Sequence, residues 1–168
     1  MCDGQCAANT RLLLKAGFGY SFLNPKLNKW AEPIGINELT SEEKDIFSQP
    51  LVHQPGEGWE YGINMDWTGR LIERVTGSSL NDYFQAHIFK PLGLSRLSFF
   101  PSAELKKHLA SLHRRGSDGK MRVHEGGHIV HKPLVVSSPE EAKTVVNAGG
   151  HGLFCSPSEY SGMLARSC

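Results

Sequence analysis

Apolar residues in the middle of the chain recur at three- and four-residue steps, the spacing of one face of an α-helix. The stripe between residues 63 and 76 consists of Trp67, Leu71, Ile72 and Val75. The stripe between residues 79 and 90 consists of Leu80, Tyr83, Phe84 and Ile88. Gly77 is placed to end the first helix, and Pro91 cannot continue the second. The pattern predicts two consecutive helices with core-facing stripes.

Shorter elements are expected on both sides of this pair. Residues 40–48 read as a helix stopped by Pro50, residues 102–108 as a short helix, and residues 157–166 as a last helix capped by Ser156. Residues 109–113 and 121–124 read as hairpin strands across a Ser-Asp-Gly turn. Residues 125–148 contain two prolines and are expected to be irregular. The fold class is therefore α+β, mainly helical.

The composition mainly excludes classes of protein, such as nucleic-acid-binding and membrane proteins. The chain has 168 residues, 39% of them hydrophobic, which is the size of one domain. Its 18 basic and 17 acidic residues give a net charge of +1, too small to attract nucleic acid or an anionic membrane. No apolar run approaches the length of a membrane span, and the first residues lack the layout of a secretory signal. A cytoplasmic location is expected.

The cysteines agree with that location. They are Cys2, Cys6, Cys155 and Cys168. Cys2 and Cys6 have no second pair at metal-ligand spacing, so reduced thiols are favoured. Cys155 is expected to be a small buried apolar side chain.

Residues 124–128 read HEGGH, the literal pattern of a zinc protease. That pattern binds zinc only on a helix, where His124 and His128 would share one face, and His131 could add a third nitrogen. Two adjacent glycines inside the turn cost roughly 1 kcal/mol each relative to alanine. Surface loop histidines are the preferred interpretation, and a small zinc-binding protein is a remote alternative.

Residues 41–44 read SEEK, which places Ser41 and Lys44 at the spacing of a nucleophilic serine and its lysine. Such a lysine must be neutral, which requires a desolvated position. A run of acidic neighbours would keep Lys44 charged. The preferred interpretation is a helix start with Thr40 or Ser41 as the N-cap.

Three further segments share a family resemblance. Residues 55–62 read PGEGWEYG and precede the first long helix, residues 16–22 read AGFGYSF, and residues 149–157 read GGHGLFCSP. Together with FKPLGL at residues 89–94, they resemble the beta-lactamase-related serine hydrolases. This family includes class C beta-lactamases, DD-peptidases, family VIII esterases and lovastatin-type transesterases. The similarity extends over residues 16–166.

The resemblance implies a mechanism and a set of site residues. In the family a serine attacks an acyl carbon, and a lysine and a tyrosine exchange protons with it. Tyr61 matches that tyrosine, although packing beneath Trp59 is an alternative role. Asn64, Gly150 and Gly152 are expected to bind the substrate, a small-molecule acyl ester or amide. The resemblance implies no cofactor and no metal.

The resemblance also implies a fold, the helical domain of a beta-lactamase/transpeptidase-like protein with most of the central sheet missing. Residues 1–15 diverge from the family, where LLLKAG at residues 12–17 replaces a more polar sequence, and residues 16–168 form a partial domain. We expect the chain to be the middle of a longer hydrolase and to be inactive by itself. A non-catalytic binding remnant is the alternative.

Surface properties follow from the missing sheet. Large side chains that normally contact it, among them Trp67, Phe84 and Phe99, are expected to be partly exposed as a contiguous apolar patch. Self-association through that surface is expected.

Overall fold

The computed structural model describes residues 16–166. The helical segments in chain order are α2 (Pro25–Ala31), η1 (Glu32–Ile34), η2 (Glu38–Thr40), α3 (Glu43–Phe47), α4 (Asn64–Thr76), α5 (Leu80–Phe84), η3 (Gln85–Phe89), α6 (Ala103–Lys106), α7 (Lys132–Val135), α8 (Pro139–Ala142) and α9 (Pro157–Arg166). Within the described part, β1 (His113–Arg115) and β2 (Met121–Val123) form one antiparallel sheet. The predicted α+β class, mainly helical with a short hairpin, is confirmed.

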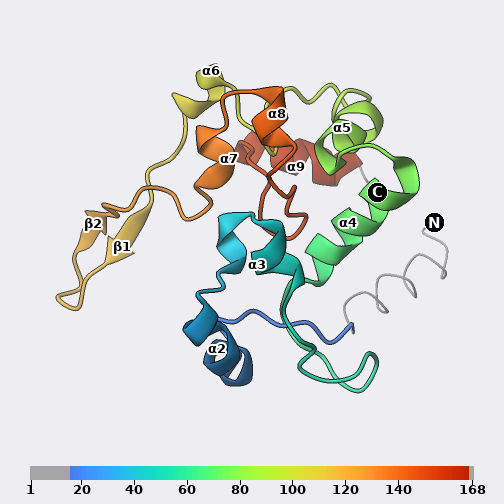
Figure 1. Cartoon of the computed structure of the whole chain (residues 1–168). Helices are drawn as coiled ribbons and strands as arrows, with labels where there is room; N and C mark the ends of the chain where they lie inside the picture. Colours follow the sequence, from blue (N-terminus) through green and yellow to red (C-terminus); the bar gives the residue numbers. More distant parts are fainter. Residues whose placement is uncertain (1–15, 167–168) are drawn as a thin grey trace.

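The hairpin and the long helices lie on opposite sides of the molecule (Figure 1). The β1–β2 hairpin projects away from the body, whereas α4 and α5 form the other side, with α9 behind α8. Every residue of both strands is exposed. The structural core is therefore built by helices and loops.

The two long helical segments confirm the predicted bounds. α4 ends at Gly77, whose φ of 71° is left-handed and whose N–H donates to the Glu73 carbonyl at 2.9 Å. α5 begins after Ser79, whose side chain accepts the Asp82 N–H at 3.1 Å. It runs directly into η3, so the predicted helix over residues 79–90 is present as two consecutive segments.

Two short helices, α2 and α8, have capping signals that the sequence analysis did not use. Before α2, Asn24 accepts the N–H of Lys26 at 3.0 Å, and Pro25 occupies the first helical position. Before α8, Ser138 accepts the Glu141 N–H at 3.2 Å. The prediction that residues 125–148 are irregular is thus wrong for α7 and α8, because a serine cap and prolines at first-turn positions favour helical turns there.

Some bounds and caps also need correction. The first strand is β1, not residues 109–113, because the turn pairs His113 with Val123. The N-cap of α3 is Glu42, not Thr40 or Ser41, although the Thr40 hydroxyl accepts the Glu42 N–H at 3.2 Å. Before α9, Ser156 accepts the Glu159 N–H at 3.4 Å, as predicted.

Two apolar clusters form the core. One consists of Tyr20, Ile46, Ile63 and Ala148, with Phe18, Phe47, Trp67 and Val146 packed around them. The other consists of Phe89, Leu94 and Leu97, with Phe84, Ile88, Leu92, Leu153 and Met163 around them. A pair of backbone hydrogen bonds between Ser98 and Phe154 ties the second cluster to the chain after the glycine-rich turn.

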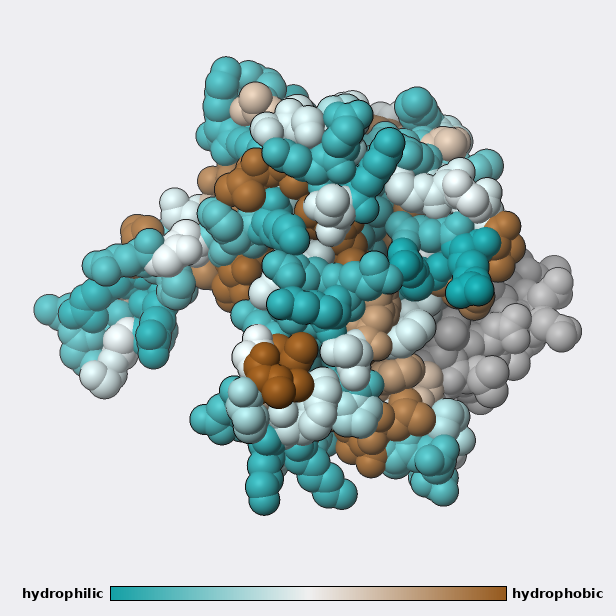
Figure 2. Space-filling model, in the orientation of Figure 1, coloured by the Kyte–Doolittle hydropathy of each residue, from teal (hydrophilic) through white to brown (hydrophobic). Residues whose placement is uncertain are grey.

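The predicted stripe on α4 is only partly buried. Trp67 and Ile72 are half-buried, but Leu71 and Val75 are 55% and 76% exposed, so the expectation that the whole stripe is core is wrong. Phe84 is half-buried as expected, whereas Phe99 is buried against the expectation. On the face seen in Figure 2, hydrophobic surface forms separate patches between hydrophilic side chains.

Candidate functional site

Residues 16–22 and 55–62, two of the segments that resemble the beta-lactamase-related family, lie close together along their backbones. Val52 N–H donates to the Gly17 carbonyl at 2.8 Å, which aligns residues 17–20 with the chain leading to Tyr61. A Cβ on Gly62 would lie 2.4 Å from the Phe18 carbonyl oxygen and 2.4 Å from Gly19 Cα. Only a glycine fits at this distance, so Gly62 fixes the position of Tyr61.

The glycine-rich turn meets the first turn of α4. A Cβ on Gly149 would lie 2.7 Å from the Met65 carbonyl oxygen. The N–H of Gly150 donates to Asp66 Oδ1 at 2.9 Å, across 84 positions of sequence. The turn is therefore held next to the tyrosine-bearing loop by one buried carboxylate.

Tyr61 lies at the surface of this junction. Its side chain is 59% exposed, and its ring centroid is 5.4 Å from that of buried Tyr20. Trp59 is also largely exposed, so Tyr61 is not a half-buried ring packed beneath it. The phenol of Tyr61 is thus accessible, with a second phenol behind it.

Buried charge lies behind the two tyrosines. Burial raises the pKa of Asp66, while the Gly150 N–H and His151 act in the opposite direction. His151 Nδ1 is 3.7 Å from Asp66 Oδ1, and burial lowers the pKa of this imidazole. Burial also raises the pKa of Tyr20, with further contributions from Asp66, Tyr61 and Glu38. A protonated Tyr20 phenol and a neutral His151 imidazole are therefore favoured.

A second buried carboxylate fixes the Tyr20 segment. Glu38 accepts the backbone N–H of Ser21 at 2.6 Å and the Ser21 hydroxyl at 2.7 Å. Gln49 Nε2 adds a donor at 3.4 Å. The charged groups that act on Tyr20 are therefore acidic, and none of them would stabilise a phenolate.

The other predicted site residues occupy interior positions or are already bonded. Asn64 is buried, and its Nδ2 donates to the carbonyls of Phe18 and Glu60 at 3.4 and 3.5 Å. Gly150 N–H is bound to Asp66, and Gly152 N–H donates to the Ala148 carbonyl at 2.7 Å. Gly150 lies beside Tyr20, whose ring is next to that of Tyr61, and none of the donors given above is free.

The Ser41–Lys44 pair does not have the geometry of a nucleophile and its lysine. Ser41 is fully buried, while the Lys44 side chain is 73% exposed and lies 3.8 Å from a Glu42 oxygen. A second Ser-x-x-Lys, which sequence reasoning missed, runs from Ser117 to Lys120. It spans the exposed hairpin turn, which is not helical. Neither lysine is desolvated.

The histidine segment is not helical. His124 follows β2 and precedes a turn, as expected for a loop. Among residues 16–166, no three His, Cys, Asp or Glu side chains lie close enough together to hold a metal ion. The geometry gives the zinc alternative through His124, His128 and His131 no support.

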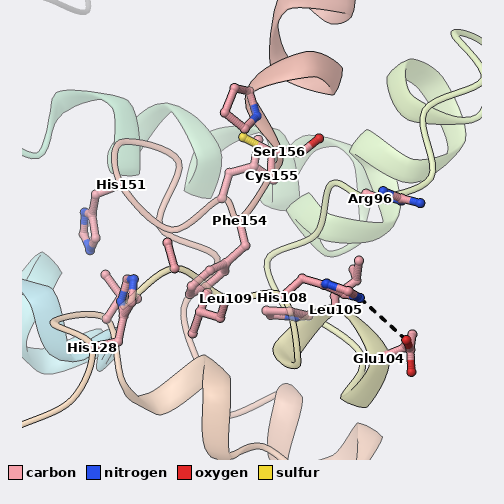
Figure 3. Close-up of a pocket in the computed structure, with 15 residues that line it drawn as sticks. Arg96, Glu104, Leu105, His108, Leu109, His128, His151, Phe154, Cys155 and Ser156 are labelled. Carbon is pink, nitrogen blue, oxygen red and sulfur yellow. Dashed lines mark ion pairs between the residues drawn. The ribbon is translucent and has the colours of Figure 1, made fainter. Parts of the chain in front are cut away.

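A cavity of about 520 Å³ adjoins the site through His151. Its walls come from α6, residues 128–130 and the chain that follows the glycine-rich turn (Figure 3). Cys155 contributes to the lining but is exposed, so the prediction that it is buried is wrong. His151 connects this cavity with Asp66.

Sequence reasoning missed the polar residues behind Tyr61. Tyr20 and His151 lie within motifs that were identified, but as parts of a backbone pattern. Asp66 had one local signal, an acidic side chain in the first turn of a helix, which is ordinarily explained by the helix dipole. Glu38 lies outside every motif, and its burial depends on contacts distant in sequence.

The fold and this junction define a class of protein, the beta-lactamase type. The beta-lactamase family model matches residues 15–165. The chain therefore belongs to the beta-lactamase family.

Named relatives are esterases and acyltransferases. Lovastatin esterase of Penicillium rubens is 34% identical over 145 residues, which is 83% of this chain and 34% of the relative. Monacolin J acid methylbutanoyltransferase of Aspergillus terreus is 31% identical over 168 residues, covering 96% of this chain and 37% of the relative. The chain spans about a third of the length of these relatives.

Solved structures of other proteins have a similar fold. The LovD6 mutant of simvastatin synthase from Aspergillus terreus has a TM-score of 0.72 at 31% identity, over 92% of this chain and 35% of that one. EstCE1, a hydrolase with promiscuous acyltransferase activity, has a TM-score of 0.69 at 19% identity, which supports the fold alone. Within residues 16–166, no helix combines the length and apolar character that crossing a membrane requires.

Proposed function

We propose that this chain supplies the tyrosine-bearing wall of an acyl hydrolase or acyltransferase site, and that its 168 residues by themselves form no acyl-enzyme. The substrate class is a small-molecule acyl ester or amide, in line with the esterase and acyltransferase names of the relatives. In this proposal Tyr61 is the proton-transfer group, and residues from 16 onward act as one partial domain.

One observation carries the proposal. The exposed ring of Tyr61, fixed by the Gly62 contact, lies 5.4 Å from the ring of Tyr20, and the Tyr20 hydroxyl in turn would lie 3.3 Å from a Cβ on Gly150. A phenol needs a neighbouring cation that stabilises the phenolate if it is to act as a base at neutral pH. The buried groups behind it are acidic or, in the case of His151, favoured as neutral. The activating cation and the nucleophile are therefore expected from outside these residues.

Asn64, Gly150 and Gly152 have a supporting part in this proposal. Their donors are bonded within the molecule, so we infer that they act on the substrate by shaping the wall. Gly150 is closely packed, because a Cβ there would lie 3.0 Å from Asp66 Oδ2 and 3.3 Å from the Tyr20 hydroxyl. A side chain at Gly150 would therefore displace one of these groups.

Covalent labelling tests the proposal. The purified chain is treated with a fluorophosphonate and, separately, with a penicillin-type acylating probe, and modified peptides are mapped by mass spectrometry. We expect no serine to be labelled more than in the heat-denatured protein, and no turnover of a p-nitrophenyl ester above buffer. Stoichiometric labelling of one serine that Y61F abolishes would overturn the claim of inactivity while supporting the role of Tyr61.

A non-catalytic binding role is the second candidate. The cavity beside His151 favours it, since a cavity can keep a ligand even where no nucleophile is present. This candidate predicts saturable binding of a small molecule without turnover.

Location and self-association also remain proposals. A reducing, cytoplasmic setting is supported by Cys155, a free thiol on the surface. Self-association is supported by the exposed apolar side chains Leu71 and Val75 on α4.

A further inference from the structure

We propose that the β1–β2 hairpin, called the hairpin arm (residues 113–123), is a docking surface for a membrane that contains anionic phospholipid. The arm lies on the membrane surface, with its cations at the lipid phosphates and its exposed apolar side chains between the head groups. This inference does not depend on acyl transfer. Failure of the proposed catalytic role would leave it standing, and the reverse is also true.

The hairpin arm differs from the rest of the molecule in its charge. Residues 113–123 read HRRGSDGKMRV, with four basic residues and one acidic residue. The whole chain has 18 basic and 17 acidic residues, so the remainder has an acidic surplus. Salt limits the attraction between exposed charges to about 8 Å, so a projecting arm responds to its own charge. The expectation that an anionic membrane is not attracted rests on the net charge of the whole chain, which conceals this local excess.

Three of the four cations are available to a ligand. Arg122 is engaged by Asp118, with Nη1 and Nη2 at 2.9 and 2.6 Å from the two carboxylate oxygens. Arg114, Arg115 and Lys120 are exposed and have no ion-pair partner among residues 16–166. Guanidinium groups form paired hydrogen bonds with phosphate oxygens, which are the charged groups of a phospholipid surface.

The strand register adds an apolar component to one face of the arm. His113 pairs with Val123 and Arg115 with Met121, and directly paired residues of an antiparallel sheet lie on the same face. The side chains of Met121 and Val123 are 56% and 60% exposed. Arg115 therefore shares its face with two exposed apolar side chains. A cation beside apolar surface is the combination that binds to the interface of an anionic bilayer.

The position of the arm makes this face accessible. The hairpin projects from the body in Figure 1, and in Figure 2 it stands clear of the other elements as a mainly hydrophilic arm. Every residue of both strands is exposed. A membrane can therefore contact the arm without displacing any part of the body.

The same residues disfavour two other kinds of partner. Charged side chains on a short edge strand oppose the addition of a strand from another protein. A nucleic acid would engage the cations through its phosphates, but those contacts are made by polar groups and gain little from Met121 and Val123. The exposed apolar pair is the observation that favours lipid over a soluble polyanion.

Vesicle flotation tests the class of partner. The full chain is mixed at 50 mM NaCl with vesicles of phosphatidylcholine, or of three parts phosphatidylcholine to one part phosphatidylserine. Lipid-bound protein floats, whereas self-associated protein does not. We expect flotation only with phosphatidylserine, and at least tenfold weaker binding at 500 mM NaCl because salt screens the cations. No flotation with phosphatidylserine at 50 mM NaCl, or equal flotation with both vesicles, would overturn the proposal.

Matched charge reversals test the location. R114E/R115E should weaken vesicle binding more than tenfold, since each cation near an anionic surface contributes about fivefold. K26E/K29E reverses two charges on α2, where both lysines are exposed, and should weaken binding less than threefold. R114Q/R115Q replaces the first variant if thermal unfolding shows that the first is not folded. Equal losses on the arm and on α2 would mean that net charge governs binding, which contradicts the proposal.

Matched apolar variants separate lipid from a soluble polyanion. M121T/V123T keeps a side chain suited to a strand at Val123 and removes apolar surface at both positions. We expect it to weaken vesicle binding about threefold or more and to leave retention on heparin unchanged. I34T/V135T, on η1 and α7, changes two side chains of similar exposure and should leave both measurements unchanged. If M121T/V123T left vesicle binding intact while the charge reversal on the arm weakened vesicle and heparin binding alike, the arm would be a general polyanion site and the assignment to lipid would be wrong.

Discussion

A close backbone contact constrains Gly62, the residue that follows Tyr61. Its backbone lies so close to residues 18 and 19 that any Cβ would overlap both a carbonyl oxygen and a Cα at 2.4 Å. Backbone atoms cannot move aside as a flexible side chain would. The position of Tyr61 therefore depends on the residue that follows it.

We expect G62A to lower the free energy of unfolding by about 1–3 kcal/mol, the usual cost of forcing extra atoms into a packed site. The loss is measured as a shift of the urea midpoint of unfolding to lower concentration. G162A is the matched control, because a Cβ on Gly162 in α9 would meet only Leu94 Cδ2 at 3.8 Å. Alanine in that helix is expected to be neutral or stabilising by up to about 1 kcal/mol. Equal midpoints for the two variants would contradict the close-approach argument.

Asp66 makes stability depend on pH. Burial raises its pKa above the ordinary value of 3.8, so the folded protein holds this proton more tightly than the unfolded chain does. The resulting stabilisation is fully present below pH 3.8 and is lost as the pH rises through the folded pKa. The titratable groups facing it are His151 and Tyr20.

D66N keeps an acceptor for the Gly150 N–H but cannot ionise. We expect the stability of D66N relative to the unmodified protein to increase as the pH is raised above about 3.8, because only the unmodified protein then bears a buried charge. His151 has a lowered pKa, so its contribution is present above its ordinary 6.5 and is lost on acidification. Urea unfolding at pH 3.5, 5 and 7 gives the free energy of unfolding of D66N and of the unmodified protein. A difference between these two free energies that stays constant with pH would count against a buried Asp66.

At the scale of elements, the helices depend on local caps as well as on packing. Ser79 accepts the Asp82 N–H at 3.1 Å and donates to the Asp82 carboxylate at 2.8 Å, so it fixes the start of α5. Leu80, the first residue of α5, is buried and its N–H donates to Glu73 Oε1 at 2.9 Å, which anchors α5 to α4. The cap and the anchor together set the angle between these helices.

We expect S79A to destabilise the protein by about 1 kcal/mol, the typical cost of losing a serine N-cap. S78A is the control one position earlier, because the contact of Ser78 uses its backbone N–H, which donates to Thr76 Oγ1 and survives the substitution. The two variants are compared by thermal unfolding followed at 222 nm. A larger loss for S78A than for S79A would show that the cap has been misassigned.

At the scale of the whole molecule, exposed apolar side chains on α4 are the surface that we propose for self-association. Leu71 and Val75 are exposed on α4, the helix whose Trp67 packs against the first core cluster. Exposed apolar side chains that gather on one helix face mark an interaction site or a tendency to aggregate.

We expect the protein to form concentration-dependent oligomers in sedimentation velocity, and the L71E/V75E double variant to shift the distribution toward monomer. Fold stability should change by less than about 1 kcal/mol, because both side chains are mainly solvated. V123E is the control, since Val123 is 60% exposed on the hairpin, on the other side of the molecule (Figure 1). A protein that stays monomeric at every concentration would contradict the prediction.

The sequence by itself determined the long helical segments, the last helix and the ancestry. These elements have short-range signals in the sequence. The apolar spacing in α4 and α5 follows the period of the helix, and Gly77 and Ser156 form hydrogen bonds with residues three or four positions away. The spaced glycine, tyrosine and proline positions indicated the beta-lactamase family for the same reason, because tight turns restrict which residues can occupy them.

Only the tertiary structure decided which groups surround Tyr61. The bond from Gly150 to Asp66, the burial of Glu38, the cavity at His151 and the exposure of Leu71 all depend on segments far apart in the chain. Hydrophobic periodicity shows that a helix has an apolar face, but it does not specify what covers that face. The side of α4 that is buried, and the carboxylate that holds the turn, follow from packing that brings distant residues together.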